Sequence, residues 1–256
     1  MSAAEALLRR VVDYAGLFPP AALDMEAAVR NYQDYLQGEH EWMLGSFVVA
    51  AARLDEFATA FENVCCGERE RPWTLSIVCV GEMAEDARRI ADFRQGAVFI
   101  GSLETKAGDP RSAEETLERL PAARARFVEF APARAAEMLP VLADHGARAK
   151  LRMGGVTPET IPDVESVAQF LRACMKERMP FKATAGLHHA IRAVHALTGK
   201  PDSARAPMHG FLNLFLAAAL AYLGADEQAI IRTLAEEDAS AFRMDDELIL
   251  WHDHTL

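Results

Sequence analysis

The sequence lacks several signatures that would assign a class directly. Its four cysteines, Cys65, Cys66, Cys79 and Cys174, show no paired CxxC spacing, which argues against a zinc-binding knuckle and predicts reduced thiols in a cytoplasmic protein. No Gly-x-Gly-x-x-Gly follows the first predicted strand, so the usual signature of dinucleotide binding is missing. We therefore expect no cofactor and no bound metal.

Two further absences limit the partners. The longest apolar run, residues 211–223, is too short to span a bilayer, and residues 1–10 lack the apolar segment of a signal peptide. Acidic residues outnumber basic ones by 38 to 27, so the net charge of −11 leaves no basic excess for nucleic acid. The sequence predicts neither a membrane nor a nucleic acid as partner. A local cluster of lysine and arginine can still bind a small anion.

What the sequence does contain is an alternation of apolar strands and amphipathic helices. Its 256 residues, 51% of them apolar, can form a large core. Strands are predicted at 12–20, 43–50, 74–80, 97–101, 126–130, 148–153, 180–185 and 208–211. Helices are predicted at 3–12, 24–36, 54–64, 84–93, 112–120, 133–144, 163–176, 189–197 and 211–223. Continuously apolar strands are typical of a parallel sheet covered by helices.

This pattern gives about eight strand–helix units, which fits an α/β fold of the (β/α)8 TIM-barrel type in a single domain over residues 1–225. A doubly wound open sheet is the alternative. Residues 226–256 depart from the pattern and predict a helix at 226–237 and a small hairpin at 242–251. We expect this extension to pack across one end of the barrel or onto a second copy of the chain, in a homo-oligomer.

Two lysines occupy equivalent positions in successive predicted strands. Lys150 stands four residues before Gly154, and Lys182 stands four residues before Gly186. Lysine is costly to bury, because burial disfavours its charged form. In a parallel barrel, side chains at the C-terminal ends of the strands face the site, and Arg152 shares a strand face with Lys150. The spacing predicts an anion-binding or imine-forming pocket.

A pair of neighbouring lysines can produce a nucleophile. Two close ammonium groups repel, which lowers the pKa of one and leaves a fraction of it as free amine. A free amine attacks a carbonyl at neutral pH. Two other interpretations stay open: both ammonium groups extend to solvent at the strand ends, or one lysine is paired with Glu129 and remains charged.

Four short motifs resemble deoxyribose-phosphate aldolase, a class I aldolase family with a (β/α)8 barrel. Residues 13–19 (DYAGLFP) are similar to that family's Asp-His-Thr-Leu-Leu strand followed by proline, and 127–130 (FVEF) to its strand with a glutamate. Residues 150–154 (KLRMG) resemble its Schiff-base strand, and 181–186 (FKATAG) the strand after it. The resemblance implies Lys150 as the imine former and Lys182 as the partner that lowers its pKa.

The sequence departs from that family at several site positions. The family's aspartate on the fourth strand has no counterpart in residues 97–101, and its phosphate-binding Gly-Ala-Ser-Ser is replaced by residues 209–213 (HGFLN). Tyr14 stands in place of a histidine, and Arg152 in place of a small hydroxyl residue. The resemblance therefore supports the fold and a lysine-lined pocket better than it supports the family's substrate.

Three histidines form a second group of candidates. His188 and His189 follow Gly186 at the exit of one predicted strand, and His209 begins another. Convergent imidazoles can act as general acids and bases or, with Glu129 or Glu104, complete a divalent metal site. Adjacent histidines point in different directions, so at most one of the pair faces a pocket. The alternative is that they are loop histidines that cap a helix start.

Asp13 and a glycine pair complete the candidates. Asp13 is either an acid or base at the first strand end or an aspartate that orders the loop before Gly16. Gly154 and Gly155 can form a backbone nest for an anion, although such pairs are common after strands. The predicted catalytic residues are Lys150, Lys182, Asp13, Glu129 and His188. The predicted substrate-binding residues are Arg152, Gly154, Gly155, Glu104, His189, His209 and Asn213.

These residues support three hypotheses. The first is a Schiff-base lyase of the aldolase type that acts on a small anionic carbonyl compound. The second is a metal-assisted hydrolase or isomerase that uses His188, His189 and His209 with a carboxylate. The third is a barrel that binds an anionic metabolite without catalysis.

Overall fold

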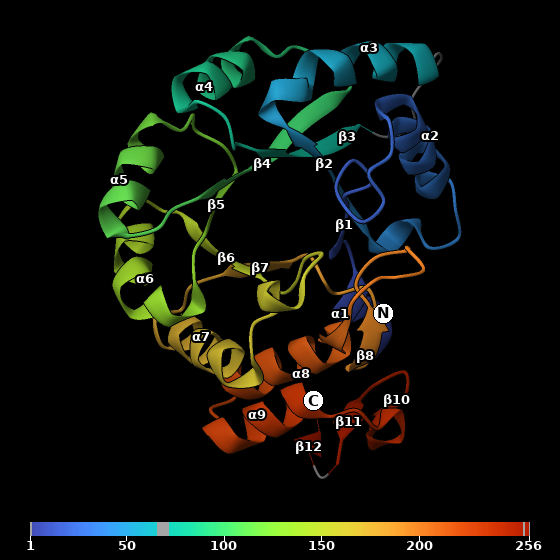
Figure 1. Cartoon of the computed structure of the whole chain (residues 1–256), viewed down its shortest axis with the longest axis vertical. Coiled ribbons are helices and arrows are strands. Elements are labelled where there is room, and N and C mark those ends of the chain that lie inside the picture. The colour runs from blue at the N-terminus through green and yellow to red at the C-terminus, as the bar shows by residue number, and fades with distance from the viewer. Residues whose placement is uncertain (1, 66–71, 253, 256) are drawn as a thin grey trace. The chain divides into compact units, whose positions relative to one another are not determined.

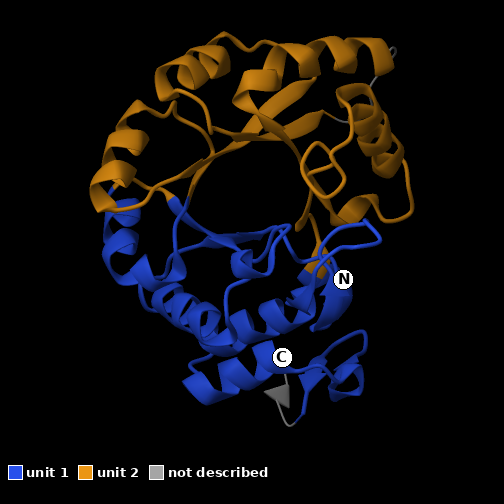
Figure 2. Ribbon diagram, viewed as in Figure 1, with its two compact units in different colours: residues 1–7, 129–144, 148–256 blue, residues 8–128, 145–147 orange. Residues whose placement is uncertain are grey.

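The computed structural model describes residues 2–65, 72–252 and 254–255. It divides the chain into two compact units, which Figure 2 shows in two colours. Unit 1 comprises residues 1–7, 129–144 and 148–256, and unit 2 comprises residues 8–128 and 145–147. Strands alternate with helices in both units (Figure 1), so the predicted α/β class is confirmed.

Unit 2 is built on a sheet whose strands follow the order of the chain. The strands are β1 (Val12–Tyr14), β2 (Leu44–Ala50), β3 (Trp73–Val78), β4 (Val98–Lys106) and β5 (Ala125–Glu129), of which the last residue belongs to unit 1. β1 to β4 pair in parallel. In this register Ser76 of β3 lies beside Ser102 of β4. Parallel strands in chain order require a helix between each pair, and the sequence supplies these helices.

The helices of unit 2 cover an aromatic core. They are α2 (Met25–Leu36), α3 (Leu54–Val64), α4 (Met83–Asp92) and α5 (Pro110–Arg119). The rings of Tyr32, Phe47, Phe61 and Trp73 pack with centroids between 4.5 and 5.8 Å apart. Each is nearly or fully buried, and burial of a large apolar side chain contributes about 1.5–3 kcal/mol. This cluster holds α2 and α3 against β2 and β3.

Unit 1 combines a parallel strand pair with four long helices. The long helices are α6 (Ala135–Asp144), α7 (Val164–Lys176), α8 (Phe211–Tyr222) and α9 (Glu227–Ala235). The short helix α1 (Ala3–Leu8) also belongs to unit 1, except for its last residue. Its parallel strands are β6 (Arg148–Arg152) and β7 (Phe181–Thr184). α8 is apolar on nearly all sides, and α7 and α9 pack against it and cover its apolar surface.

The predicted helix at 189–197 is wrong. This segment contributes β8 (Ala193–Ala196), which pairs with β9 (Arg205–Met208) in an antiparallel hairpin. Exposed and less exposed residues alternate along both strands, which is the period of a strand with one covered face. Leu197, Ala206 and Met208 form a small buried cluster on which Ile161 packs. A short segment without a wide apolar stripe gains more from this pairing than from a helix.

The predicted strand at 208–211 is also different, because β9 ends at Met208 and runs antiparallel to β8. A single parallel bridge joins His189 to Gly210 immediately before α8. In unit 1, β6 and β7 pair in parallel, whereas β8 pairs antiparallel with β9, and β11 pairs antiparallel with β10 and β12.

The C-terminal segment has the helix and hairpin that the sequence predicts. α9 is followed by the antiparallel strands β10 (Phe242–Met244), β11 (Ile249–Trp251) and β12 (His254–Thr255). Trp251 is buried, and the Ala3 N–H donates to the carbonyl of Asp246 at 3.0 Å. Both ends of the chain are thus hydrogen-bonded within unit 1.

Two local predictions need correction. β4 extends to Lys106, so Glu104 lies within this strand rather than after it. The helix predicted at 112–120 begins earlier, because its N-cap is Asp109, which forms a capping box with Ser112. Asp109 accepts the Ser112 N–H at 2.8 Å, because Pro110 begins the helix two residues earlier than predicted.

The remaining predictions concern cysteines and membrane spans. Cys79 and Cys174 are buried free thiols, Cys65 is buried with its Sγ 3.5 Å from Oε1 of Gln33, and Cys66 lies outside the described residues. Among the described helices, none has the length and apolar character needed to cross a membrane.

Candidate active site

The two lysines of the predicted pocket lie on neighbouring strands of unit 1. In the β6–β7 pair, Lys150 is the register partner of Lys182, and Arg152 is the register partner of Thr184. Register partners in parallel strands point to the same face of a sheet, with their backbones about 4.8 Å apart. Lys150 and Lys182 therefore share one face of this pair, as their equal spacing from a glycine predicts.

A buried ion pair involves the first of these lysines. Lys150 is only 8% exposed and Glu129 7%. The Lys150 Nζ lies 3.0 Å from Oε2 of Glu129, and Nη1 of Arg152 lies 3.8 Å from the other carboxylate oxygen. The Arg152 side chain is half exposed. The carboxylate therefore contacts a buried ammonium and a guanidinium that reaches solvent, so the paired arrangement is the one observed.

This arrangement can exchange a proton and bind an anion. When a proton moves from Lys150 to Glu129, a buried free amine beside a carboxylic acid results, and both groups stay hydrogen-bonded. The exposed part of Arg152 has the fork geometry that suits a carboxylate or phosphate.

Two glycines touch just after the two strands. A Cβ placed on Gly154 would lie 2.8 Å from Cα of Gly186, whose φ of +70° is in the left-handed region. The Met153 N–H donates to the carbonyl of Thr184 at 2.9 Å, which extends the strand pairing up to this contact. Gly155 is also confined, because its Cβ would lie 2.6 Å from Oγ1 of Thr160. The backbone here is fixed by close packing, whether or not it binds an anion.

His188 and His189 have different surroundings. His188 is exposed, yet desolvation of its ring lowers its pKa, which leaves a neutral imidazole able to accept a proton. His189 stacks on His195 with ring centroids 3.4 Å apart and an angle of 11° between the rings. Desolvation, followed by the charges of His195 and His188, lowers the pKa of His189. His195 was not a predicted site residue. It contacts His189 because residues 193–196 form the strand β8, and not the helix that the sequence predicts.

His209 is buried and tied to the loop before α7. Its Nε2–H donates to the carbonyl of Pro162 at 2.7 Å, and its Nδ1 has no hydrogen-bond partner among the described residues. Burial is the main cause that lowers its pKa, and Arg192 adds to this. The Pro162 bond and Asp163 act in the opposite direction. The neutral ring thus connects β9 to the preceding loop.

Asn213 is fully buried in α8, and its side chain makes three hydrogen bonds. It accepts the Arg192 N–H at 2.9 Å and donates to the carbonyls of Thr233 and Glu236, each at 2.8 Å. These bonds use both amide hydrogens and connect the hairpin, α8 and α9. A structural role is therefore evident, and a part in substrate binding stays a prediction.

The other predicted site residues, Glu104 and Asp13, lie in unit 2. Glu104 is 2% exposed and accepts a hydrogen bond from the hydroxyl of Ser76, which lies 2.6 Å from that of Ser102. Neither serine is among the predicted site residues. The available signal was the alternation of polar residues at 102 and 104 in an otherwise apolar strand, with Ser76 on the strand before it.

Asp13 connects the first two strands of unit 2. Its Oδ1 accepts the Ser46 N–H at 2.6 Å, and a Cβ on Gly45 would lie 2.3 Å from the same oxygen. Asp13 is half-buried, so part of its carboxylate reaches solvent. The contact orders β1 against β2, and the catalytic role of Asp13 stays a prediction.

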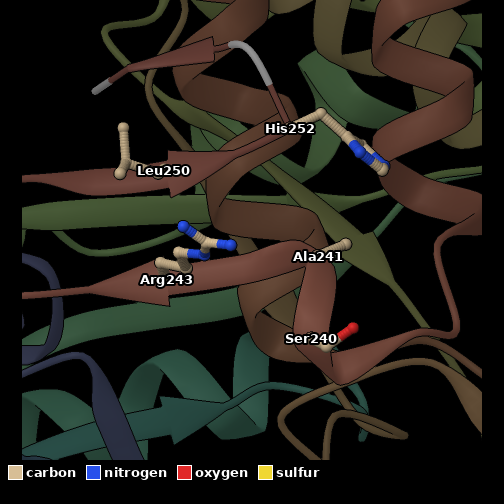
Figure 3. Close-up of a pocket in the computed structure, with 5 residues that line it drawn as sticks. All are labelled: Ser240, Ala241, Arg243, Leu250 and His252. Atoms are coloured by element: carbon tan, nitrogen blue, oxygen red, sulfur yellow. The ribbon is translucent and has the colours of Figure 1, made fainter.

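A cavity of about 370 Å³ lies in the C-terminal extension (Figure 3). Its lining residues come from β10, β11 and the segments next to them: Ser240, Ala241, Arg243, Leu250 and His252. His252 donates from Nε2 to Glu236 at 2.8 Å. No predicted site residue borders this cavity, so it is separate from the lysine pair.

Comparisons with known proteins add no assignment. No protein-family model, curated protein or solved structure matches this chain. We therefore infer the function from the geometry of the described residues.

Proposed function

We propose that the protein is a lysine-dependent lyase of the aldolase type that acts on a small anionic carbonyl compound. The observation that supports this most is the register pairing of Lys150, which is only 8% exposed, with Lys182 on the same face of β6 and β7. A nearly buried amine with a proton acceptor in contact and a second positive charge beside it is suited to imine formation. The resemblance of residues 150–154 and 181–186 to a class I aldolase agrees with this assignment.

In the proposed reaction, Glu129 first takes a proton from Lys150. The free amine adds to the substrate carbonyl, and the resulting carbinolamine loses water when Glu129 returns the proton to the leaving hydroxyl. The protonated imine then accepts the electron pair of the carbon–carbon bond that breaks, while a base removes the proton of the β-hydroxyl group. Protonation of the enamine carbon and hydrolysis of the imine release the second product and restore Lys150.

The other residues have supporting roles. Arg152 and the backbone at Gly154 and Gly155 hold the anionic group of the substrate. Lys182 places a second positive charge on the strand face that carries Lys150. The neutral imidazole of His188 is the candidate base for the β-hydroxyl, since desolvation lowers its pKa. Asp13 and Glu104 remain proposed acid–base and substrate-binding groups.

We further propose that the parallel strands form a (β/α)8 barrel over residues 1–225 in a cytoplasmic protein. The chain order of the strands in unit 2, and the parallel pair β6–β7, support such a fold. The segment 208–211 would have to provide the eighth position, and its parallel bridge from Gly210 to His189 supports that placement.

Chemical trapping tests the function directly. The protein is incubated with small aldehydes and keto acids, reduced with borohydride and digested, and the adduct mass is located. The chain contains only five lysines, so each site is resolved. We expect an adduct at Lys150, none in Lys150→Met, and full labelling in the control Lys200→Met, which alters an exposed lysine. Lys182→Met should slow labelling at neutral pH.

The trapping experiment also separates the other hypotheses. Labelling spread over exposed lysines, or none at Lys150 across the panel, would remove the Schiff-base mechanism. Thermal shifts with anionic metabolites but no turnover would then favour a binding protein. A metal-assisted mechanism through the three histidines has less support, because Nε2 of His209 is bonded to Pro162 and His189 is stacked on His195.

A further inference from the structure

Three metal-ligating side chains converge in unit 2, in a place that the proposed reaction does not use. Glu114 and Glu118 lie one turn apart on α5, and His145 comes from the segment 145–147 of the same unit. One ligand atom of each residue lies within 4.8 Å of those of the other two. Both glutamates are exposed, and His145 is half-buried. The group therefore has a side open to solvent.

The composition of this group differs from that of an ordinary acidic surface. Two glutamates spaced i,i+4 repel each other at a cost of about 0.2–0.5 kcal/mol, so their proximity is unfavourable without a cation. The third member is an imidazole from a separate chain segment. A nitrogen and two oxygens form a mixed donor set that suits divalent transition metals better than Mg²⁺ or Ca²⁺, which prefer oxygen ligands alone.

A half-buried arginine fixes the backbone on both sides of the group. The guanidinium of Arg126, on β5, donates to the carbonyl of Leu117 in α5 at 3.1 Å and also to the carbonyl of His145. Gly146 follows with a φ of +58°, which permits the tight turn after His145. One side chain thus holds the histidine backbone at the end of α5 that carries Glu118.

The spacing suits a metal after small side-chain rotations. Zinc binds histidine nitrogen and glutamate oxygen at about 2.0–2.2 Å, which places tetrahedral ligand atoms about 3.4 Å apart. A maximum separation of 4.8 Å can close to this value by rotation of the two exposed glutamates, whose side chains are free to move in solvent. Water can occupy the remaining position on the open side.

We propose that Glu114, Glu118 and His145 bind one divalent transition-metal ion, with Zn²⁺ as the best match among the common ions. The bound ion links α5 to the segment that leads into β6. Its effect is on stability, because an ion that binds only the folded chain raises the melting temperature. The proposal does not depend on the lysine mechanism.

Titration calorimetry on the full, tag-free chain, stripped of metal with a chelator, tests this site. We expect one Zn²⁺ per chain and much weaker binding of Mg²⁺. Three single variants should each lower the Zn²⁺ affinity about tenfold or more: Glu114→Gln, Glu118→Gln and His145→Gln. Even the loss of a residue that only orients a metal ligand has an effect of this size. Glu115→Gln on the same helix and His40→Gln, which both alter exposed residues, should leave it unchanged.

A second measurement uses the melting temperature. Zn²⁺ should raise it in the wild type and in both controls, and not in the triple variant of Glu114, Glu118 and His145. The variants are compared without metal as well, so that loss of folding is recognised separately. Equal Zn²⁺ affinity in wild type and triple variant, or no stoichiometric binding up to millimolar Zn²⁺, would overturn the proposal.

Discussion

Two buried glutamates, one in each unit, lie on strands and have different neighbours. In unit 2, Glu104 accepts a hydrogen bond from the hydroxyl of Ser76, which in turn contacts Ser102. In unit 1, Glu129 contacts the ammonium of Lys150 at 3.0 Å. Both carboxylates are nearly inaccessible to solvent, with exposed fractions of 2% and 7%. The two glutamates are thus similarly buried, but one is bonded to a neutral hydroxyl and the other to a charged ammonium group.

The difference bears on what each carboxylate can do. A hydroxyl can donate to a carboxylate, or accept from a carboxylic acid, so it accommodates either protonation state. An ammonium group carries a full charge. Removal of either member of the Lys150–Glu129 pair therefore leaves the other as an unpaired charge that is shielded from water. We therefore expect the Glu129 pair to be costly to break and able to exchange a proton, and the Glu104 contact to be cheaper to lose.

The largest effect is expected when the ion pair of unit 1 is broken. Lys150→Met leaves Glu129 buried without its ammonium and should lower the free energy of unfolding by about 3–5 kcal/mol. Urea denaturation measures it. The double variant Lys150→Met, Glu129→Leu should recover part of the loss, because no charge is then stranded. A double variant less stable than the single one would contradict this account.

The matched change in unit 2 should cost less. Ser76→Ala removes the hydroxyl that donates to Glu104 and should lower the free energy of unfolding by about 1–3 kcal/mol. Ser240→Ala, which alters an exposed hydroxyl, serves as the control in the same denaturation series. If Ser76→Ala costs as much as Lys150→Met, the comparison between hydroxyl and ammonium partners fails.

A third prediction concerns acid stability and the buried histidine of unit 1. The pKa of folded His209 lies below its ordinary value of 6.5, mainly because of burial, so between these two values the unfolded chain binds more protons than the folded chain. The contribution of His209 to the free energy of unfolding is therefore complete above pH 6.5 and is lost as the pH falls towards the folded pKa. One proton changes this free energy by no more than about 1.4 kcal/mol per pH unit.

The pH dependence of unfolding in His209→Gln checks this sign. Between pH 6.5 and the folded pKa, the free energy of unfolding of His209→Gln should depend less steeply on pH than that of the wild type. The control His40→Gln, which changes an exposed residue of unit 2, should have the wild-type slope. A steeper slope in His209→Gln would mean that the ring is charged in the folded protein.

The smallest effects should come from helix caps, one in each unit. Asp24 accepts the Ala27 N–H at 2.8 Å at the start of α2, and Asp163 accepts the Ser166 N–H at 2.6 Å at the start of α7. Both aspartates are exposed, so replacement by alanine should cost about 1 kcal/mol in either case. Melting temperatures of the two variants measure this. Unequal losses would show that the units differ in how strongly a local change affects global unfolding.

Much of the fold follows from local patterns in the sequence. The helix 54–64 was predicted with its observed bounds, because Leu54, Phe57 and Phe61 recur at helical spacing and pack into the core of unit 2. The helices predicted at 24–36 and 163–176 are also observed, and the first predicted residue of each, Asp24 or Asp163, is its N-cap. The hairpin of β8 and β9 was not, since its stability comes from pairing with a strand further along the chain and from packing on Ile161.

The candidate site shows the same division. Equal spacing from a following glycine was enough to place Lys150 and Lys182 in register, because parallel neighbours that end at the same level align residue by residue. The serines around Glu104 and the stack of His189 on His195 depend on neighbours in other segments, which spacing along one strand does not reveal. Contacts of this kind need coordinates.

The contact between Gly154 and Gly186 limits how this protein can change. Even a methyl group at either position would collide with backbone of the neighbouring strand exit, 2.8 Å away. New binding specificity therefore has to come from residues further along the two connections, where lengths and side chains can vary. A library that randomised these two codons would return glycine among its active members, and variants elsewhere in the same loops would carry the diversity.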